Sequence, residues 1–416
     1  MSRHRRVRRG GRVRILLLAA VTVALSGCAL SGHPASSSPR VLGQPRGTAL
    51  VLGQPAPAGT GDLGAVSCPT ARRCWAVGVA GPNPPTTPAG AAVIVVTTDG
   101  GTSWNAQDVA GGSTPELSGV ACPTSTQCMA VGSNGSSLPG SGVVVTTDDA
   151  GRTWSPAAAP PNILAIVAVE CTSPADCTLI ASSGTSTWSA HSDDFGTSWQ
   201  QGGNLPTSFQ AGNDLTCVTG GDCLVAGYVP TSNGHGQGAV AVSSDDGGTW
   251  TLATVPSGTG ILRSTACLSA SECLAAGSTS TTVSDVVPAK GELLRSADGG
   301  NTWTPSSSPV PVEDVYGLAC PSAQLCAMVG TYWVGYPAAP AGAVAQSGDG
   351  GTVFRLSTAA YIPSTLTGLS CPTSAACLAV GGRTVARITL VTPRRAPTTT
   401  STSTVPSPVG TQSGQR

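Results

Sequence analysis

Fourteen of the fifteen cysteines form seven pairs, and every pair has the spacing C-x5-C. Thiols at this spacing suit two chemistries, a local disulfide across a turn or metal coordination. A zinc site needs four converging ligands, usually with closer cysteines, and the four histidines (His4, His33, His191, His235) do not follow the repeat. We therefore expect disulfides and no metal in an exported chain, with the pairs Cys68/Cys74, Cys122/Cys128, Cys171/Cys177, Cys217/Cys223, Cys267/Cys273, Cys320/Cys326 and Cys371/Cys377.

Carboxylates recur with the same period, in an eight-residue box that follows each of the first six cysteine pairs. The second copy reads TDDAGRTW, and five copies end in tryptophan whereas the sixth ends in Phe354. Such aspartates suit either acid–base catalysis or the closing of a turn. The aspartates are Asp99, Asp149, Asp194, Asp245, Asp298 and Asp349.

The elements that position these residues repeat about every fifty positions. In each unit, strand A ends at the first cysteine, strand B starts at the second, strand C is a valine-rich run and strand D starts at the box tryptophan. No long stretch has the apolar spacing of a helix. Four antiparallel strands in a repeat of this length predict an all-β fold, a seven-bladed β-propeller.

The box S-x-D-x-G-x-T-W resembles the Asp-box, or BNR repeat, of sialidases, sortilin-type receptors, xyloglucan-specific glucanases and photosystem II assembly-factor propellers. The resemblance covers nearly all of residues 48–393 and is greatest to the seven-bladed assembly-factor-like and sortilin-like propellers. It implies that the box aspartates close the turn between strands C and D, with Phe354 in the sixth aromatic place. It also implies that the box tryptophans pack between blades, namely Trp104, Trp154, Trp199, Trp250 and Trp303. The sequence departs from the assembly factors in its cysteine pairs and in lacking an arginine-rich patch.

The count of seven cysteine hairpins against six boxes indicates how the ring closes. The last unit stops after its strand C, whereas Thr48–Gly61 precedes the first hairpin, where a strand D would lie. We expect this N-terminal segment to supply the outer strand of the seventh blade, which removes exposed sheet edges.

The first 27 residues predict a lipoprotein signal peptide, with an arginine-rich start, an apolar stretch and the sequence Leu-Ser-Gly before Cys28. We expect Cys28 to be lipidated, because it is the one cysteine outside the pairs; an ordinary signal peptide is the alternative. Residues 28–47 predict a flexible tether, 48–393 the propeller and 394–416 a disordered Thr/Ser/Pro tail. The protein is then extracytoplasmic and anchored to the bacterial cell membrane; for its export we favour the general secretory route over the twin-arginine route.

The charge balance argues against a nucleic-acid partner. Seven of the 21 basic residues lie within the first 14 positions, which leaves 14 basic residues against 21 acidic ones from Cys28 onward. A chain with this balance has no basic stripe to neutralise phosphates. We expect a monomer, since one closed ring satisfies its own sheet edges.

The fold predicts where a ligand would bind. Chain direction alternates along a blade, so the A–B hairpins and C–D turns share one face, and the B–C loops lie on the other. The sixth B–C loop carries Tyr332, Trp333 and Tyr336, and Tyr228 lies in the fourth. Such aromatic residues can stack on sugars or anchor a protein, or simply pack on their own loops. His235, Trp188 and His191 are further candidates around the ring.

An enzyme would need converging carboxylates outside the boxes, and none of the candidates has a recognisable setting. Sialidases carry an F-R-I-P motif that this sequence lacks. No nucleotide-binding loop or redox C-x-x-C occurs, so no cofactor is expected. We therefore predict a binding or scaffold protein at the cell envelope with a protein or glycan partner; the alternative is a glycoside hydrolase or carbohydrate-binding protein. The carboxylates are Glu116, Glu170, Asp214, Asp285, Glu292, Glu313 and Asp314.

Overall fold

The structure is a computed structural model. It describes residues 48–81, 91–109, 116–138, 140–184, 186–207, 209–211, 214–218, 220–232, 235–281, 289–334, 339–357 and 362–392. The signal peptide, Cys28, the tether and the C-terminal tail lie outside the described residues. In the described part of the chain, no helix has the length and apolar character needed to cross a membrane.

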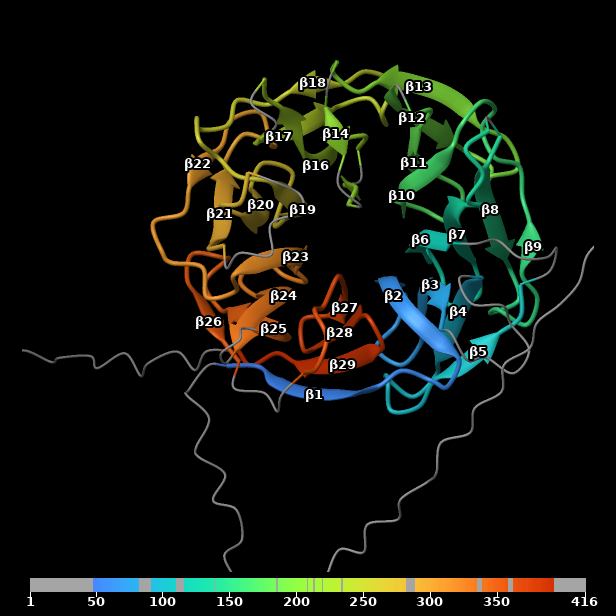
Figure 1. The fold of residues 1–416 in the computed structure, drawn as a ribbon, viewed down its shortest axis with the longest axis horizontal. Coiled ribbons are helices and arrows are strands. Elements are labelled where there is room, and N and C mark those ends of the chain that lie inside the picture. Colours follow the sequence, from blue (N-terminus) through green and yellow to red (C-terminus); the bar gives the residue numbers. More distant parts are fainter. Residues whose placement is uncertain are drawn as a thin grey trace, which may run out of the picture. The chain divides into compact units, whose positions relative to one another are not determined.

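The chain from Thr48 to Thr392 forms seven antiparallel sheets in a ring, which confirms the predicted seven-bladed β-propeller (Figure 1). Blades 1 to 3 consist of β2 (Thr60–Ser67), β3 (Cys74–Ala80), β4 (Ala92–Thr97) and β5 (Asn105–Gln107); β6 (Glu116–Ala121), β7 (Cys128–Ser133), β8 (Gly142–Thr147) and β9 (Ser155–Pro156); β10 (Ala165–Cys171), β11 (Cys177–Ser182), β12 (Thr187–Ser192) and β13 (Gln200–Asn204). Blades 4 to 6 consist of β14 (Gln210–Ala211), β15 (Thr216–Cys217), β16 (Cys223–Pro230), β17 (Gly236–Ser243) and β18 (Thr251–Leu252); β19 (Leu262–Cys267), β20 (Cys273–Ser278), β21 (Gly291–Ser296) and β22 (Thr304–Pro305); β23 (Asp314–Ala319), β24 (Cys326–Val334), β25 (Ala339–Ser347) and β26 (Phe354–Leu356). Blade 7 consists of β27 (Gly368–Thr373), β28 (Ala376–Gly381), β29 (Thr384–Thr389) and β1 (Leu50–Pro55).

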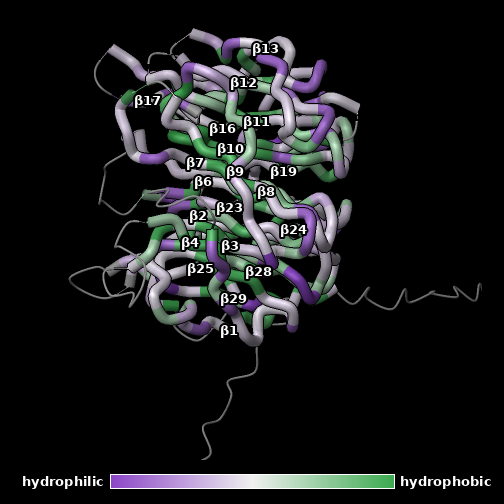
Figure 2. Tube along the Cα trace, turned by 90° about the vertical axis from the view of Figure 1, so that its right-hand side faces the viewer, coloured by the Kyte–Doolittle hydropathy of each residue, from purple (hydrophilic) through white to green (hydrophobic). Residues whose placement is uncertain are grey.

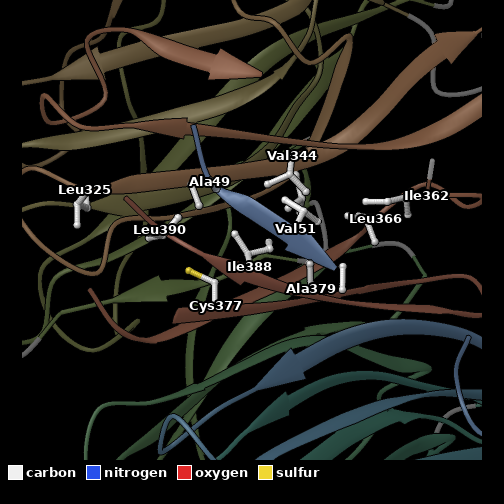
Figure 3. Close-up of a cluster of buried hydrophobic side chains, with 13 residues drawn as sticks. Ala49, Val51, Leu325, Val344, Ile362, Leu366, Cys377, Ala379, Ile388 and Leu390 are labelled. Carbon is white, nitrogen blue, oxygen red and sulfur yellow. The ribbon is translucent and has the colours of Figure 1, made fainter. Parts of the chain in front are cut away.

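The N-terminal strand closes the ring, as predicted. β1 pairs antiparallel with β29 from Leu50 opposite Thr389 to Pro55 opposite Thr384. Val51 is only 3% exposed, and Figure 3 shows it beside Val344 and Ile388 in the hydrophobic cluster between blades 6 and 7. The first strand of the fold therefore fills both an edge and a core position of the last blade.

The core is divided into seven clusters that lie mainly between neighbouring blades. Strands B and C of each blade supply most of it; β3, for example, is buried at six of its seven positions. The strands are accordingly mostly hydrophobic in Figure 2, and the turns are more hydrophilic. Each blade thus buries its apolar side chains against the next one, as a repeat array requires.

All seven predicted disulfides are present, each joining the end of strand A to strand B of one blade. The Cα atoms of each pair lie 4.0 to 4.1 Å apart, because the two cysteines face each other across a short hairpin. Each bridge closes a short loop, which stabilises a fold by about 2 kcal/mol in the chain-entropy model.

The hairpin that holds Cys377 requires a correction to the predicted strand ends. Strand A was expected to end at Cys371 and strand B to start at Cys377, but β27 continues to Thr373 and β28 already begins at Ala376. The reason is a tighter turn, because Thr373 pairs directly with Ala376 beyond an irregularity in the ladder. The predicted bridge between Cys371 and Cys377 still forms, and Cys377 is 3% exposed in the cluster between blades 6 and 7.

Candidate binding site

The end of the ring that carries the disulfides is closed by hydrogen-bonded turns. In blade 2, Asp149 Oδ1 accepts hydrogen bonds from Thr147 Oγ1 at 2.9 Å and from Thr153 N at 3.0 Å, and Oδ2 accepts one from Thr153 Oγ1. The bond from the Thr153 amide is the main cause that lowers the pKa of Asp149 to about 2. This carboxylate is therefore held ionised by its own turn and is a poor proton donor or acceptor.

At the same end, a backbone hydrogen bond joins the box turn to the A–B hairpin in each of the first six blades. The residue after the box aspartate donates its backbone N–H to the A–B hairpin, as Ala150 does to Thr126 O at 2.9 Å and Asp246 to Gly221 O at 2.9 Å. Ala150 and Gly151 both have positive φ, 67° and 79°, so this turn requires the left-handed conformation twice in succession. The disulfide and box of a blade thus form one structural unit.

The box aromatic residues pack between blades. Trp154 is 1% exposed among residues of blades 1 and 2, and its Nε1 donates to Gln107 Oε1 at 2.9 Å. Trp104 lies in a cluster with residues of blade 7, and Trp250 and Trp303 are buried in equivalent clusters. Trp199 is half-buried and donates to Ala158 O.

The opposite end of the ring, where strand A begins and strand B ends, contains a depression of about 750 Å³. Six of the seven blades border it, and its polar lining is supplied by Asp62, Glu116, Ser118, Gln210, Tyr228, Arg263, Tyr316, Ser364, Thr365 and Thr367. Below this mouth lies a narrower section of about 150 Å³, to which all seven blades contribute. Both share Gly64, Tyr316 and Thr367 in their linings, so they form one channel along the ring axis.

Arg263 is the one basic residue that lines the described channel, and it is already paired. Its Nε donates to Asp314 Oδ1 at 3.1 Å, and its guanidinium carbon lies 4.7 Å from the centre of the Tyr316 ring. Burial, followed by the negative charge of Asp314, raises the pKa of Tyr316. The positive charge of Arg263 is thus largely balanced within the wall.

Two carboxylates lie in the narrow section, Glu170 on β10 and Asp214 just before β15. Desolvation, followed by the charge of Asp214, raises the pKa of Glu170 to about 8. Desolvation also raises the pKa of Asp214 to about 6, although hydrogen bonds from Thr265 and Ser264 oppose it. Both residues are half-buried, because they border the channel, yet the surrounding blades leave their carboxylates poorly solvated.

The two carboxylates differ in their hydrogen bonding to the next blade. Asp214 Oδ2 accepts the backbone N–H of Thr265 in blade 5, just as Ser264 Oγ accepts that of Leu318 in blade 6. Glu170 occupies the place of Ser67, whose hydroxyl accepts the amide of Cys122 in the next blade. Within the part of the chain that the structure describes, no group donates a hydrogen bond to the Glu170 carboxylate.

The structure brings only part of the predicted ligand face together. Tyr228 lines the channel mouth. Tyr332 and Trp333 lie on β24, because the sixth B–C loop is largely a continuation of the β24–β25 ladder, in which Tyr332 pairs with Ala341. Tyr332 is 39% exposed but does not line the channel, and Tyr336 lies outside the described residues.

Three further candidates do not join the mouth. Trp188 is 6% exposed in the cluster between blades 2 and 3, so it belongs to the core. His191 lies next to the box at the disulfide end, because it pairs with Thr178, the neighbour of Cys177. His235 Nδ1 is 2.9 Å from Thr281 Oγ1.

The candidate catalytic carboxylates do not converge on one site. Glu292 Oε2 accepts the backbone N–H of Gly260 at 2.7 Å, and Glu313 Oε2 accepts that of Trp333 at 2.8 Å. Asp314 pairs with Arg263, Glu116 lies at the mouth, and Asp285 is outside the described residues. Glu170 and Asp214 lie close enough for their charges to interact, and the neighbours Glu313 and Asp314 are each engaged elsewhere, with the Trp333 amide and with Arg263. Among the described residues, no group of three or more His, Cys, Asp or Glu side chains could hold a metal ion.

Sequence reasoning missed Arg263, Tyr316, Ser118 and Gly64 as channel residues. Each stands four positions before the first cysteine of its blade, at a β-bulge where the A–B pairing skips one residue. A bulge redirects the side chain of the extra residue. Aligning the repeats on the cysteines would have revealed this column as mostly small, polar or aromatic where a buried strand is otherwise apolar, with Val167 of blade 3 as the exception.

A second depression, of about 500 Å³, lies at the disulfide end between blades 4 and 5. Box and turn residues line it, including Asp298, Thr249 and Ser243, whose polar groups already bond within their own turns.

No protein-family model matches the sequence, and no curated protein matches it. Solved structures show the same fold. YCF48 bound to a D1 peptide is 15% identical, with a TM-score of 0.57 over 83% of this chain and 97% of that one. YCF48 from Cyanidioschyzon merolae is 13% identical, with a TM-score of 0.52 over 81% and 98%. The GH74 xyloglucanase from Xanthomonas campestris is 14% identical, with a TM-score of 0.54 over 80% of this chain and 52% of that one.

Proposed function

We propose that this protein is an exported, lipid-anchored propeller that binds a protein partner at the channel mouth and acts as a binding or scaffold protein at the cell envelope. The observation that carries the proposal is the contrast between the two ends of the ring. One end carries self-bonded turns, which also line its smaller depression of about 500 Å³, whereas the other has a depression of about 750 Å³ that six blades border. A depression of this size, with convergent polar groups and a tyrosine, suits recognition of a peptide segment.

Export and anchoring are supported by the cysteines. Disulfides in every blade suit an oxidising compartment, and Cys28 is the cysteine left over after an apolar stretch. A Cys28→Ser variant should lose incorporation of labelled palmitate and move from the membrane fraction to the soluble fraction. Retention of both properties would remove the lipid anchor from the proposal.

Peptide recognition also agrees with one structural neighbour, since YCF48 was solved with a bound D1 peptide. The low identity means that this likeness supports the fold of a peptide-binding propeller and not the same partner.

A glycoside hydrolase is the alternative, favoured by one observation, the adjacent carboxylates Glu170 and Asp214 with unequal pKa values of about 8 and about 6. These carboxylates lie in a section of about 150 Å³, which is smaller than typical ligand pockets of roughly 300 Å³ or more. We therefore favour binding. Release of reducing sugar from xyloglucan or sialosides, lost in Glu170→Gln, would reverse this preference.

Site-specific photo-crosslinking in cells tests the binding function. A photoreactive amino acid replaces Tyr228 at the mouth, or Leu252 on the outer strand β18, where the side chain is 46% exposed. We expect one defined protein adduct from position 228 and not from position 252. The same adducts from both positions, or none from the mouth, would contradict a binding site there.

A further inference from the structure

The channel has two sections whose different volumes suit the backbone and one side chain of a bound polypeptide. Its mouth of about 750 Å³ narrows to a section of about 150 Å³, and the shared lining residues make the passage continuous. A volume of about 750 Å³ accommodates a short polypeptide segment, whereas about 150 Å³ accommodates one extended side chain. A ligand that uses both parts would lie across the mouth and project a side chain along the axis.

The charged side chains that line the described channel are mostly acidic. Four carboxylates line the described channel, Asp62 and Glu116 at the mouth and Glu170 and Asp214 below. The only lining cation is Arg263, and Asp314 already pairs with it. An anionic segment would be repelled, and a neutral sugar would leave these carboxylates without counter-charge.

Glu170 provides an observation independent of this charge count. It lines the narrow section, and no described group donates a hydrogen bond to its carboxylate. Its counterpart Ser67 accepts the amide of Cys122 in the next blade, whereas the Glu170 carboxylate makes no inter-blade hydrogen bond of this kind with the described residues. Its raised pKa reflects desolvation of the carboxylate and then the negative charge of Asp214.

We propose that the channel accepts a lysine or arginine side chain from a flexible polypeptide segment of the partner, with its cationic head between Glu170 and Asp214. The aliphatic stem of that side chain passes Tyr316 and Thr367, which line both sections. Asp62 and Glu116 attract the segment to the mouth. This inference rests on the proposed function and specifies the chemistry of the partner.

Fluorescence anisotropy with a defined probe tests this chemistry on the intact mature protein. The probe is a short labelled peptide in which lysine alternates with serine, and its control carries acetyl-lysine, which keeps the stem and removes the charge. At low ionic strength we expect the lysine peptide to bind at least about tenfold more tightly than the control, which corresponds to about 1.4 kcal/mol. Equal binding of the two peptides would overturn the inference.

Matched carboxylate variants distinguish the channel from general surface attraction. Glu170→Gln should weaken lysine-peptide binding at least about fivefold, whereas Glu272→Gln should not, because Glu272 is exposed on the A–B hairpin of blade 5 at the disulfide end. Equal losses in both variants, or no loss in Glu170→Gln, would contradict a cation site in the channel.

Calorimetry adds a readout that a structural role of Glu170 would not give. At pH 7 the free protein carries a protonated Glu170, so a cationic head should displace that proton. Binding heats in two buffers of different ionisation enthalpy should reveal proton release that is absent in Glu170→Gln; no release in the wild type would contradict the placement of the head.

If position 228 still crosslinks one protein while the peptide experiments fail, the binding function stands and only the cationic chemistry is wrong.

Discussion

Replacing Glu170 with glutamine should make the propeller more stable at alkaline pH and leave its stability unchanged at acidic pH. In the folded protein, desolvation and then the charge of Asp214 hold the pKa of Glu170 at about 8, against 4.5 for an exposed glutamate. Between these values the unfolded chain releases the proton that the folded chain retains. The free energy of unfolding of the wild type must therefore fall as pH rises through this window.

The size of the effect follows from the pKa difference. Each unit corresponds to about 1.4 kcal/mol, so the contribution of Glu170 reaches at most about 5 kcal/mol once pH exceeds 8. Glutamine stays neutral and keeps nearly the same shape, so the variant lacks this loss. We expect Glu170→Gln to equal the wild type near pH 4 and to exceed it by about 2 to 5 kcal/mol near pH 9.

Denaturant unfolding with the disulfides intact, at pH 4, 7 and 9, measures this difference. Glu116→Gln serves as control, because Glu116 also lines the channel but is exposed at its mouth. It should follow the wild type at every pH. The reasoning is refuted if the gap between Glu170→Gln and the wild type does not widen with pH, or if Glu116→Gln behaves identically.

Two further predictions concern the box turn and the closing strand. Asp149→Asn should lower the Tm measured by calorimetry by a few degrees, because the hydrogen-bond acceptor in the turn loses its charge. Asp148→Asn, at the exposed neighbouring position, should leave Tm unchanged. Equal shifts in both variants would mean that the hydrogen bonds to Asp149 do not stabilise the fold. Val51→Asp should destabilise the fold by more than about 3 kcal/mol, because it buries a charge between blades 6 and 7. Leu52→Asp on the same strand, 52% exposed, should change stability by less than about 0.5 kcal/mol in the same denaturant assay, and similar losses in both variants would contradict the observed register.

The repeat allowed most of the fold to be predicted from the sequence. Each unit carries its own cysteine hairpin and box turn, so local signals define four strands, and the seven-against-six count indicates that β1 completes blade 7. The length of the strands was less predictable. Strand D is only Ser155–Pro156 in blade 2, and in blade 7 the strands on both sides of the turn extend beyond Cys371 and Cys377. The sixth B–C loop is mostly strand, because backbone pairing there does not depend on side-chain pattern.

The candidate site was predicted only in part. Strand alternation indicated the end of the ring at which the channel mouth lies and included Tyr228, because loops and strand ends share that end. It missed Arg263 and Tyr316, because the prediction considered only the loops, whereas a one-residue bulge in strand A turns these two side chains toward the channel. It also included Trp188 among the ligand-face candidates, whereas this tryptophan on strand C packs between blades 2 and 3.

The closing strand also has a consequence for how the chain folds. β1 lies at the start of the domain, and its partner β29 ends at Thr389, so the ring cannot close before nearly the whole domain has been synthesised. From the synthesis of β29 until β1 pairs with it, β29 presents an unpaired edge and the hydrophobic site of Val51 is uncovered. To close the ring, β1 must find β29 at the other end of the same chain. This intramolecular pairing competes with intermolecular pairing, in which β1 of a second copy binds the same edge of β29. Crowding of newly made chains would favour such strand exchange, whereas slow delivery of single chains would favour the closed ring.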